Sequence, residues 1–186
     1  MTDDATAAAL VRLEAHEAIR QLAARYALAV DSRDLDTLVS LFVPDVRVGG
    51  GTVGREALRD SFDDSLRAIG VSVLNVGTHV IDLVDEDHAT GTVYCKGEIQ
   101  DGDRWIHQAI VYDDRYRRVD GTWCFVRRVH RLFYGAEVGV NPLGLPPADW
   151  PEHHDGTGTL PAAWDTWVRF WGPEPDRSPR TVHPPR

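Results

Sequence analysis

The sequence predicts an α+β fold in which N-terminal helices pack on one face of a curved antiparallel sheet. Apolar residues keep a helical spacing through the first 70 residues, whereas four runs rich in valine, isoleucine and aromatic residues follow between Val73 and Gly135. Turn residues separate these runs at short intervals, which is typical of an antiparallel meander. Because the helices precede the strands as a block, we expect them together on one face of the sheet.

Three helices are expected before the sheet. The first spans residues 5–31, where apolar residues recur at three- and four-residue steps. Helical spacing continues in SRDLDTLVSLF and returns in GREALRDSFDDSLRAIG, where Gly70 suits a C-terminal cap. Between these two helices, DVRVGGGTVG alternates as a strand does and ends in glycine, so a short strand is predicted there.

The expected strands are VLNVGTHVIDLV, ATGTVYCKGEIQ, RWIHQAIVYDDRYRRV and GTWCFVRRVHRLFYG. With the helices, they make residues 1–140 one domain. The composition then shifts toward proline, which predicts a C-terminal extension over residues 141–186. Within it AAWDTWVRFW can form a short helix, and RSPRTVHPPR is expected to lack structure. The extension could serve as a lid or as a dimer contact.

Charge and composition exclude several classes of partner. The formal net charge is −9 and the pI is near 5.3, so the protein would repel nucleic acid and anionic membranes. The N-terminus lacks the basic and apolar regions of a secretory signal, and we expect a cytoplasmic protein. Cys95 and Cys124 lack metal-site spacing and are expected as reduced core residues. Neither a metal nor a cofactor is expected, because no HExxH, GxGxxG or similar motif occurs.

Tyr26 and Asp31 form a first candidate pair near the end of the first helix. Five residues correspond to roughly 140° of helical rotation, so the two share a face only where the helix bends or ends. A phenol and a carboxylate together can supply a hydrogen-bond donor and a base. The same two residues also fit a packed tyrosine and an aspartate that caps the next helix.

His79 and Asn75 form a second pair, four residues apart on the first predicted strand. The period of two predicts that both lie on one face, with Gly77 between them. If that face is concave, His79 is a natural proton shuttle, and a buried carboxylate such as Asp31 would fix its tautomer. A histidine in a strand equally fits a core or edge residue.

Two further residues are candidates for the site only if their side chains point to the concave face of the sheet. His107 on the third strand could add a second imidazole. The fourth strand carries Arg127, Arg128 and Arg131, and an inward arginine would hold a substrate oxyanion or pair with Asp31. Arg131 is the expected choice, with Arg127 and Arg128 on the exposed face.

Three segments resemble the SnoaL-like family of the nuclear transport factor 2-like superfamily: IRQLAARYALAVDSRDLDTLVSLFVPDVRV, ATGTVYCKGE and IVYDDRYRRVDGTWCFVRR. The resemblance implies a cone-shaped α+β barrel around an apolar pocket, cofactor-free chemistry on a hydrophobic small molecule, and a homodimer or homotrimer. The superfamily includes polyketide cyclases, ketosteroid isomerase, scytalone dehydratase, bile-acid 7α-dehydratase and a dehydrochlorinase.

The dehydratases and the dehydrochlorinase of this superfamily use a buried Asp–His dyad. The resemblance places Asp31 at their aspartate and Tyr26 at the tyrosine of the bile-acid enzyme. It places Asn75, and not His79, at their usual histidine. Arg131 resembles an arginine of the bile-acid enzyme if a shift of one residue is allowed.

These observations predict a lyase, such as a dehydratase, or an isomerase that acts on a polycyclic or terpenoid-like molecule by proton abstraction. His79 or Asp31 would be the base and Tyr26 the acid, while Asn75 would orient the substrate and Arg131 would stabilise negative charge. Two alternatives stay open. One is a cyclase or epoxide-opening enzyme that uses Asp31, and the other is a non-enzymatic binding module, which the Asn75 position favours.

Overall fold

The computed structural model of the protein describes residues 2–149 and 151–172. The helices are α1 (Thr2–Asp31), α2 (Leu35–Ser40), α3 (Arg55–Arg67) and α4 (Asp165–Trp171). The strands are β1 (Ser72–Leu83), β2 (His88–Asp101), β3 (Arg104–Val119) and β4 (Thr122–Val138). No helix within the described residues is both long enough and apolar enough to cross a membrane.

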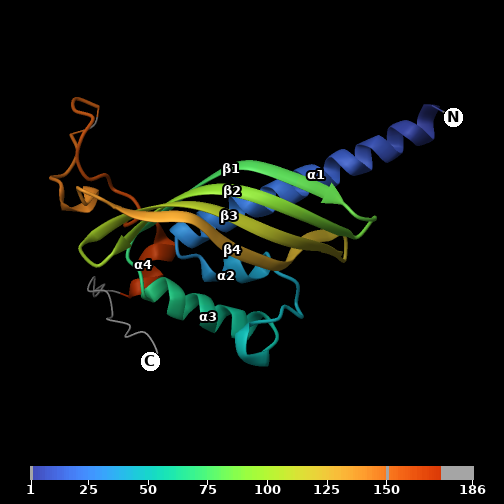
Figure 1. Ribbon diagram of the computed structural model, residues 1–186, viewed down its shortest axis with the longest axis horizontal. Coiled ribbons are helices and arrows are strands. Elements are labelled where there is room, and N and C mark those ends of the chain that lie inside the picture. The colour runs from blue at the N-terminus through green and yellow to red at the C-terminus, as the bar shows by residue number, and fades with distance from the viewer. Residues whose placement is uncertain (1, 150, 173–186) are drawn as a thin grey trace.

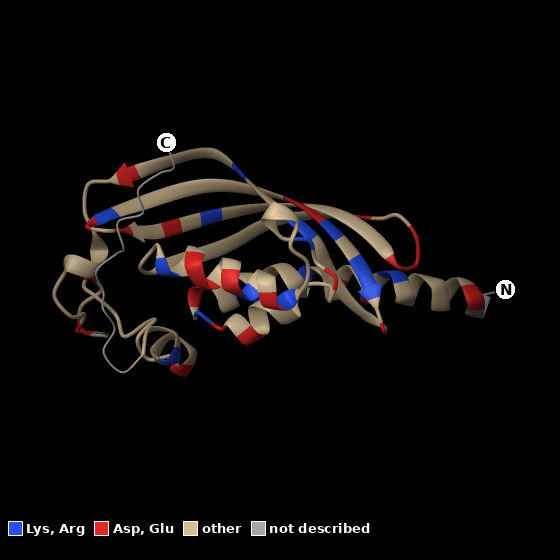
Figure 2. Ribbon diagram, turned by 90° about the horizontal axis from the view of Figure 1, so that it is seen from below, with Lys and Arg blue, Asp and Glu red and all other residues tan. Residues whose placement is uncertain are grey.

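The four strands form one antiparallel sheet in the order β1-β2-β3-β4, and the helices lie on one face of this curved sheet (Figure 1). The predicted α+β fold is therefore confirmed. Helix α1 runs along the sheet and its N-terminal turns project beyond it (Figure 1), where Leu10 and Leu13 are exposed. Acidic and basic positions are interspersed along the helical layer (Figure 2).

The hydrophobic core lies between the concave face of the sheet and the helices. Three clusters of buried residues form it, and Tyr26 of α1 packs against all three. The strands alternate buried and exposed residues because one face packs on the helices and the other faces solvent. Cys95 and Cys124 are free and buried in this core, as predicted.

Two local predictions are wrong. Residues 45–54 form a loop with one bridge, Arg47 to Val53, around a short 3₁₀ turn, η1 (Gly49–Gly51), instead of a strand. Glycines with positive φ curl the chain here, at φ values of 71° for Gly50 and 85° for Gly51. Helix α3 is capped at Ala68 and not at Gly70.

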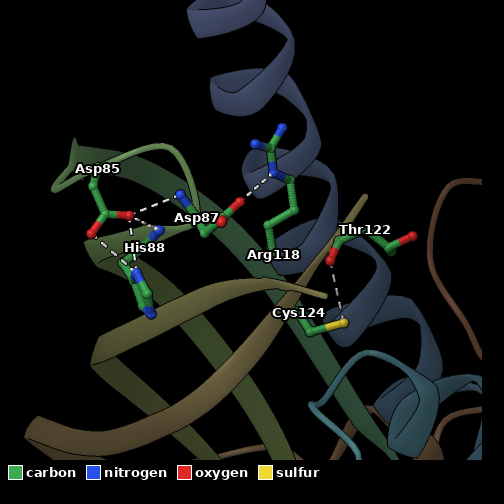
Figure 3. Close-up of polar contacts among 6 residues, drawn as sticks. All are labelled: Asp85, Asp87, His88, Arg118, Thr122 and Cys124. Carbon is green, nitrogen blue, oxygen red and sulfur yellow. Dashed lines mark hydrogen bonds and ion pairs between the residues drawn. The ribbon is translucent and has the colours of Figure 1, made fainter. Parts of the chain in front are cut away.

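The predicted turn between β1 and β2 is held by side chains of its own (Figure 3). The carboxylate of Asp85 accepts hydrogen bonds from the backbone N–H groups of Asp87 and His88, each at 2.8 Å. Arg118 donates from Nε to Asp87 at 2.9 Å, and this bond ties the turn to β3. In the same region, Cys124 Sγ lies 3.8 Å from the carbonyl of Thr122.

The C-terminal extension returns to the helical layer. A 3₁₀ turn, η2 (Pro142–Gly144), starts it, and α4 confirms the short helix predicted in AAWDTWVRFW. Arg67 of α3 donates to the carbonyl of Phe170 at 3.0 Å, and Thr166 donates to the carbonyl of Ser32 at 2.7 Å. Helix α4 therefore packs near the C-terminal ends of α1 and α3. RSPRTVHPPR lies outside the described residues.

Candidate functional site

The concave face of β3 carries three polar or aromatic side chains in alternate positions. Tyr112, Asp114 and Tyr116 are 5%, 3% and 1% exposed, respectively, so all three are enclosed. They share a face because successive side chains of a strand point to opposite sides. Antiparallel pairing sets Arg128 of β4 opposite Asp114. The interior of the cone thus contains a carboxylate and a guanidinium beside two phenols.

A β-bulge in β1 decides which of its residues face this interior. Val76 pairs with Cys95, but His79 pairs with Val93, so Gly77 and Thr78 together oppose one residue of β2. A bulge of this kind interrupts the alternation of side chains. His79 therefore points inward beside buried Val93.

Asn75, on the other side of the bulge, pairs with Lys96, and both residues are exposed on the outer face. The prediction that Asn75 and His79 share one face is wrong. Strict alternation would hold only for an unbroken strand.

His79 joins the interior polar groups through Tyr116. Its Nε2 atom lies 3.1 Å from the Tyr116 hydroxyl oxygen, and that hydroxyl donates to Asp114 Oδ2 at 2.8 Å. Because the phenol has a single proton and gives it to Asp114, His79 must donate from Nε2. The other ring nitrogen, Nδ1, then keeps its lone pair and can accept a proton.

Arg128 completes what we call the inner network, which consists of His79, Tyr116, Asp114 and Arg128. Its Nε and Nη2 donate to the two carboxylate oxygens of Asp114 at 2.9 and 2.7 Å. The side chains of Arg128 and Asp114 are 4% and 0% exposed. Such a two-point ion pair holds both charges in place in the interior.

One nitrogen of the Arg128 guanidinium takes no part in this ion pair. Its Nη1 atom is buried and has no hydrogen-bond partner. The guanidinium carbon lies 4.4 Å from the ring centre of Tyr26 and 4.3 Å from that of Tyr112. Burying an N–H group without a partner costs free energy, and such a group is ready to bind an anion or a polar atom.

Burial sets the protonation states of these groups. It lowers the pKa of His79 below its ordinary value of 6.5. The negative charge of Asp114 raises the same pKa, but this effect is smaller than that of burial. His79 is therefore a neutral base near pH 7. Burial also raises the pKa of Tyr26 and of Tyr116, so both phenols keep their protons and act as donors.

Asp31 lies away from His79. Its two oxygens accept hydrogen bonds from Ser72 Oγ at 2.9 Å and from the Leu74 backbone N–H at 2.8 Å, at the N-terminal end of β1, whereas His79 follows the bulge. Leu74 and His79 are separated by roughly 15 Å along the strand. The structure therefore does not form the predicted Asp31–His79 dyad. Burial raises the pKa of Asp31 to about 6.

The other two predicted site residues lie outside the cone. Arg131 pairs across the strands with Val111, binds Asp113 at 2.7 Å and has a side chain that is 70% exposed. His107 lies 3.4 Å from Glu98 and is 47% exposed. The expectation that Arg131 points inward is wrong, because alternation along β4 brings Arg128 to the inner face instead.

Of the predicted site residues, the structure thus gathers Tyr26 and His79, and it adds Asp114, Tyr116 and Arg128. The spacing Y-x-D-x-Y in β3 could have revealed the first two additions, since it puts two phenols and a carboxylate on one face. Within the described parts of the chain, no group of three or more metal-binding side chains occurs.

Comparisons with known proteins agree with this architecture. Residues 11–129 match the model of the SnoaL-like domain. Gamma-hexachlorocyclohexane dehydrochlorinase from Sphingobium indicum is 31% identical over 126 residues, which are 64% of this chain and 81% of that protein.

Two solved structures share the fold. A type 3 hexachlorocyclohexane dehydrochlorinase from Novosphingobium barchaimii has a TM-score of 0.65 and 25% identity, over 74% of this chain and 99% of that one. A nuclear transport factor 2-like protein from Novosphingobium aromaticivorans has a TM-score of 0.59 and 28% identity, over 69% and 88% of the two chains. The domain match, supported by these relatives, shows that the chain belongs to the SnoaL-like family.

Proposed function

We propose that the protein is a cofactor-free lyase that eliminates a halide or a hydroxyl group from an apolar cyclic molecule, with His79 as the base. Membership of the SnoaL-like family supports an activity of the lyase or isomerase type. The observation that carries the proposal is the hydrogen bond from His79 through Tyr116 to Asp114, because it directs the basic Nδ1 atom of His79 away from the network.

In this proposal His79 Nδ1 removes a proton from the carbon next to the one that bears the leaving group. The electrons of the broken C–H bond form the new C=C bond, and the leaving group departs with the electrons of its own bond. The imidazolium that forms is stabilised by Tyr116 and by the charge of Asp114 behind it. If no group leaves and the His79 imidazolium returns the proton to a different carbon of the substrate, the double bond shifts and the result is an isomerisation instead.

Arg128 would bind the departing group. Its buried Nη1 donor has no partner, so it can stabilise negative charge that develops on a halide or an oxygen. Tyr26 lies beside the guanidinium and remains protonated, which suits a hydrogen-bond donor or a general acid for a departing hydroxyl.

The carboxylate-driven alternative, in which Asp31 opens an epoxide or drives a cyclisation, receives less support. Both oxygens of Asp31 already accept hydrogen bonds that tie α1 to β1. Neither Asn75, His107 nor Arg131 faces the interior, so we assign none of them a role in the chemistry.

Homo-oligomer formation in the cytoplasm is part of the same proposal. The outer face of the sheet exposes Tyr94, Phe133 and Tyr134, at 48%, 65% and 52%. An apolar patch on the outer face of a sheet is a reasonable surface for a second copy. Light scattering of the wild type and of Phe133→Ser would check this, since a monomeric wild type would contradict it.

The experiment for the catalytic proposal is an elimination assay. Polychlorinated cyclohexanes, among them γ-hexachlorocyclohexane, and cyclic alcohols with a neighbouring C–H group are incubated with the protein, and chloride or alkene formation is followed. We expect turnover of at least one substrate, a loss of 100-fold or more in His79→Gln, and full activity in Arg131→Ala. Turnover that survives His79→Gln, or tight binding without any turnover, would contradict the proposal.

A further inference from the structure

A groove beside the β2–β3 turn and the C-terminal end of β4 is not used by the proposed chemistry. It measures about 300 Å³, and its apolar wall is formed by Ile69, Ile99 and Ile106 with the backbone of Gly135. An ion-pair network forms the rim, in which Arg104 binds Asp101 at 3.2 Å and Glu137 at 3.0 Å. We call this the Gln108 groove, after the polar residue that lines it.

Gln108 brings an unsatisfied acceptor to this apolar groove. Its Oε1 atom is buried and has no hydrogen-bond partner. Gln108 faces the inside of the cone, because it lies two and four residues from the inward side chains of Ile110 and Tyr112 on β3. A buried carbonyl oxygen without a donor destabilises the folded state, so its retention needs an explanation.

Both neighbours of Gln108 across the sheet are glycines. Gln108 pairs with Gly97 of β2 and with Gly135 of β4. A Cβ atom on Gly135 would meet Ile106 and Gln108 only at 3.8 Å, an ordinary contact distance, and neither glycine has a positive φ. Gly135 is therefore not required by backbone conformation. A side chain at position 135 would lie in van der Waals contact with Gln108 and Ile106, on the surface that lines the groove.

A strip of the concave face along β4 lies between the groove and the inner network. Leu132 pairs with buried Ile110 and His130 pairs with buried Tyr112, so both point to the concave face. They are nevertheless exposed, and Leu132 is 51% exposed. An inward-facing apolar side chain that stays exposed marks an uncovered strip of the concave face. This strip leads from Gln108 toward Arg128.

We propose that the Gln108 groove is the far end of the substrate site, and that it selects an elongated apolar molecule with a hydroxyl group remote from the reacting carbon. The hydroxyl would donate to Gln108 Oε1, and the apolar body would lie on Ile106 and Leu132. Gln108 is then a specificity-determining residue and not a catalytic one. The assignment of the reacting end rests on the proposed lyase function, whereas the hydroxyl preference rests on the groove alone.

A matched pair of fluorescent probes tests the preference. 1-Hydroxypyrene and 1-methylpyrene have nearly the same shape, and only the first can donate to Gln108. We expect the wild type to bind 1-hydroxypyrene about tenfold more tightly, which is the effect of one buried hydrogen bond. Gln108→Leu should abolish this preference, and Gly135→Val should weaken both probes at least tenfold because its side chain fills the groove. Arg131→Ala on the outer face is the control and should bind both as the wild type does.

A thermal melt distinguishes a ligand-binding role of Gln108 from a structural one. If Gln108 is kept for a ligand, Gln108→Leu removes an unsatisfied buried acceptor and should raise Tm by about 2–4 °C while it removes the probe preference. A structural role would lower Tm in the same variant.

The outcomes separate this inference from the lyase proposal. Three results would overturn the groove assignment even if elimination is observed. The wild type could bind the two probes equally, it could bind neither in a saturable way, or Gly135→Val could leave both affinities unchanged. Conversely, a hydroxyl preference that depends on Gln108 upholds the groove as a binding site even if no elimination occurs. His79→Gln tests the two proposals in one variant, because it should lose turnover but keep the preference for 1-hydroxypyrene.

Discussion

The imidazole of His79 lies 3.1 Å from the hydroxyl of Tyr116, a residue two strands away in the sheet. The phenol, and not the carboxylate of Asp31, is thus the group that orients the histidine. Tyr116 in turn donates to Asp114, whose charge is balanced by Arg128. In place of an Asp–His dyad, the interior holds a histidine that reaches its carboxylate through a phenol.

Removing the phenol hydroxyl should impair turnover without unfolding the protein. Tyr116→Phe leaves His79 without a partner at Nε2, so the Nε2–H tautomer is no longer favoured and the fraction of correctly oriented base falls. We expect kcat/KM in the elimination assay to fall about tenfold, the value of one hydrogen bond. Tyr134→Phe, which alters a phenol on the outer face, is the matched control and should keep full activity.

Asp113 and Asp114 are adjacent carboxylates that should differ sharply in their effect on stability. Asp114→Asn leaves Arg128 buried without a counter-charge and should lower the free energy of unfolding by about 3–5 kcal/mol. Asp113→Asn breaks only the exposed pair with Arg131 and should cost about 1 kcal/mol or less. Urea unfolding of the two variants measures both values. Equal losses would mean that the ion pair inside the cone contributes no more than the exposed one.

The carboxyl of Asp31 should make a pH-dependent contribution to stability. Its pKa is raised by burial from 3.8 to about 6, so the folded state binds the proton more tightly than the unfolded state does. The resulting stabilisation is fully present below pH 3.8 and is lost as the pH rises through 6. The cost of the ionised carboxylate at pH 7 is at most about 3 kcal/mol, because one pKa unit corresponds to about 1.4 kcal/mol.

Asp31→Asn removes this titration and tests it. An amide has a single acceptor oxygen, so the variant loses one of the two hydrogen bonds of Asp31 at every pH. Its free energy of unfolding relative to the wild type should nevertheless rise as the pH is raised from 4 to 7, by at most about 3 kcal/mol. Chemical unfolding of both proteins at the two pH values gives the comparison. A stability difference that does not change with pH would show that the burial of this carboxyl does not disfavour its charge.

The helices and strands could be predicted from the sequence, because their apolar spacing follows directly from which face is buried. The strand predicted in DVRVGGGTVG was wrong because no face of this segment is packed against the core along its length. Its alternation is too short to specify a strand, and glycines with positive φ at 50, 51 and 54 set the course of the chain instead. The conformation of such a segment depends on its backbone dihedral angles and tertiary contacts, and not on the local alternation of apolar residues.

The candidate site was harder to predict because it depends on register. Period-two counting put Asn75 and His79 on one face, and only the bulge at Gly77 and Thr78 separates them. A glycine inside a strand is a known sign of a bulge, so Gly77 was the available signal. For Arg128 the signal was incomplete, since alternation separates Arg128 from Arg131 but does not reveal which of them faces inward. The pairing of Asp114 with Arg128 settles that choice.

The protonation of the His79 ring tests its assignment as the base most directly, and needs no substrate. Nitrogen NMR of protein labelled in its histidine rings, with His79→Gln to identify the signals, reports which nitrogen carries the proton and where the ring titrates. We predict a proton on Nε2, a free lone pair on Nδ1 and a pKa below 6.5, with the tautomer preference weakened in Tyr116→Phe. A proton on Nδ1, or a ring that titrates above 6.5 and is indifferent to Tyr116, would contradict the account.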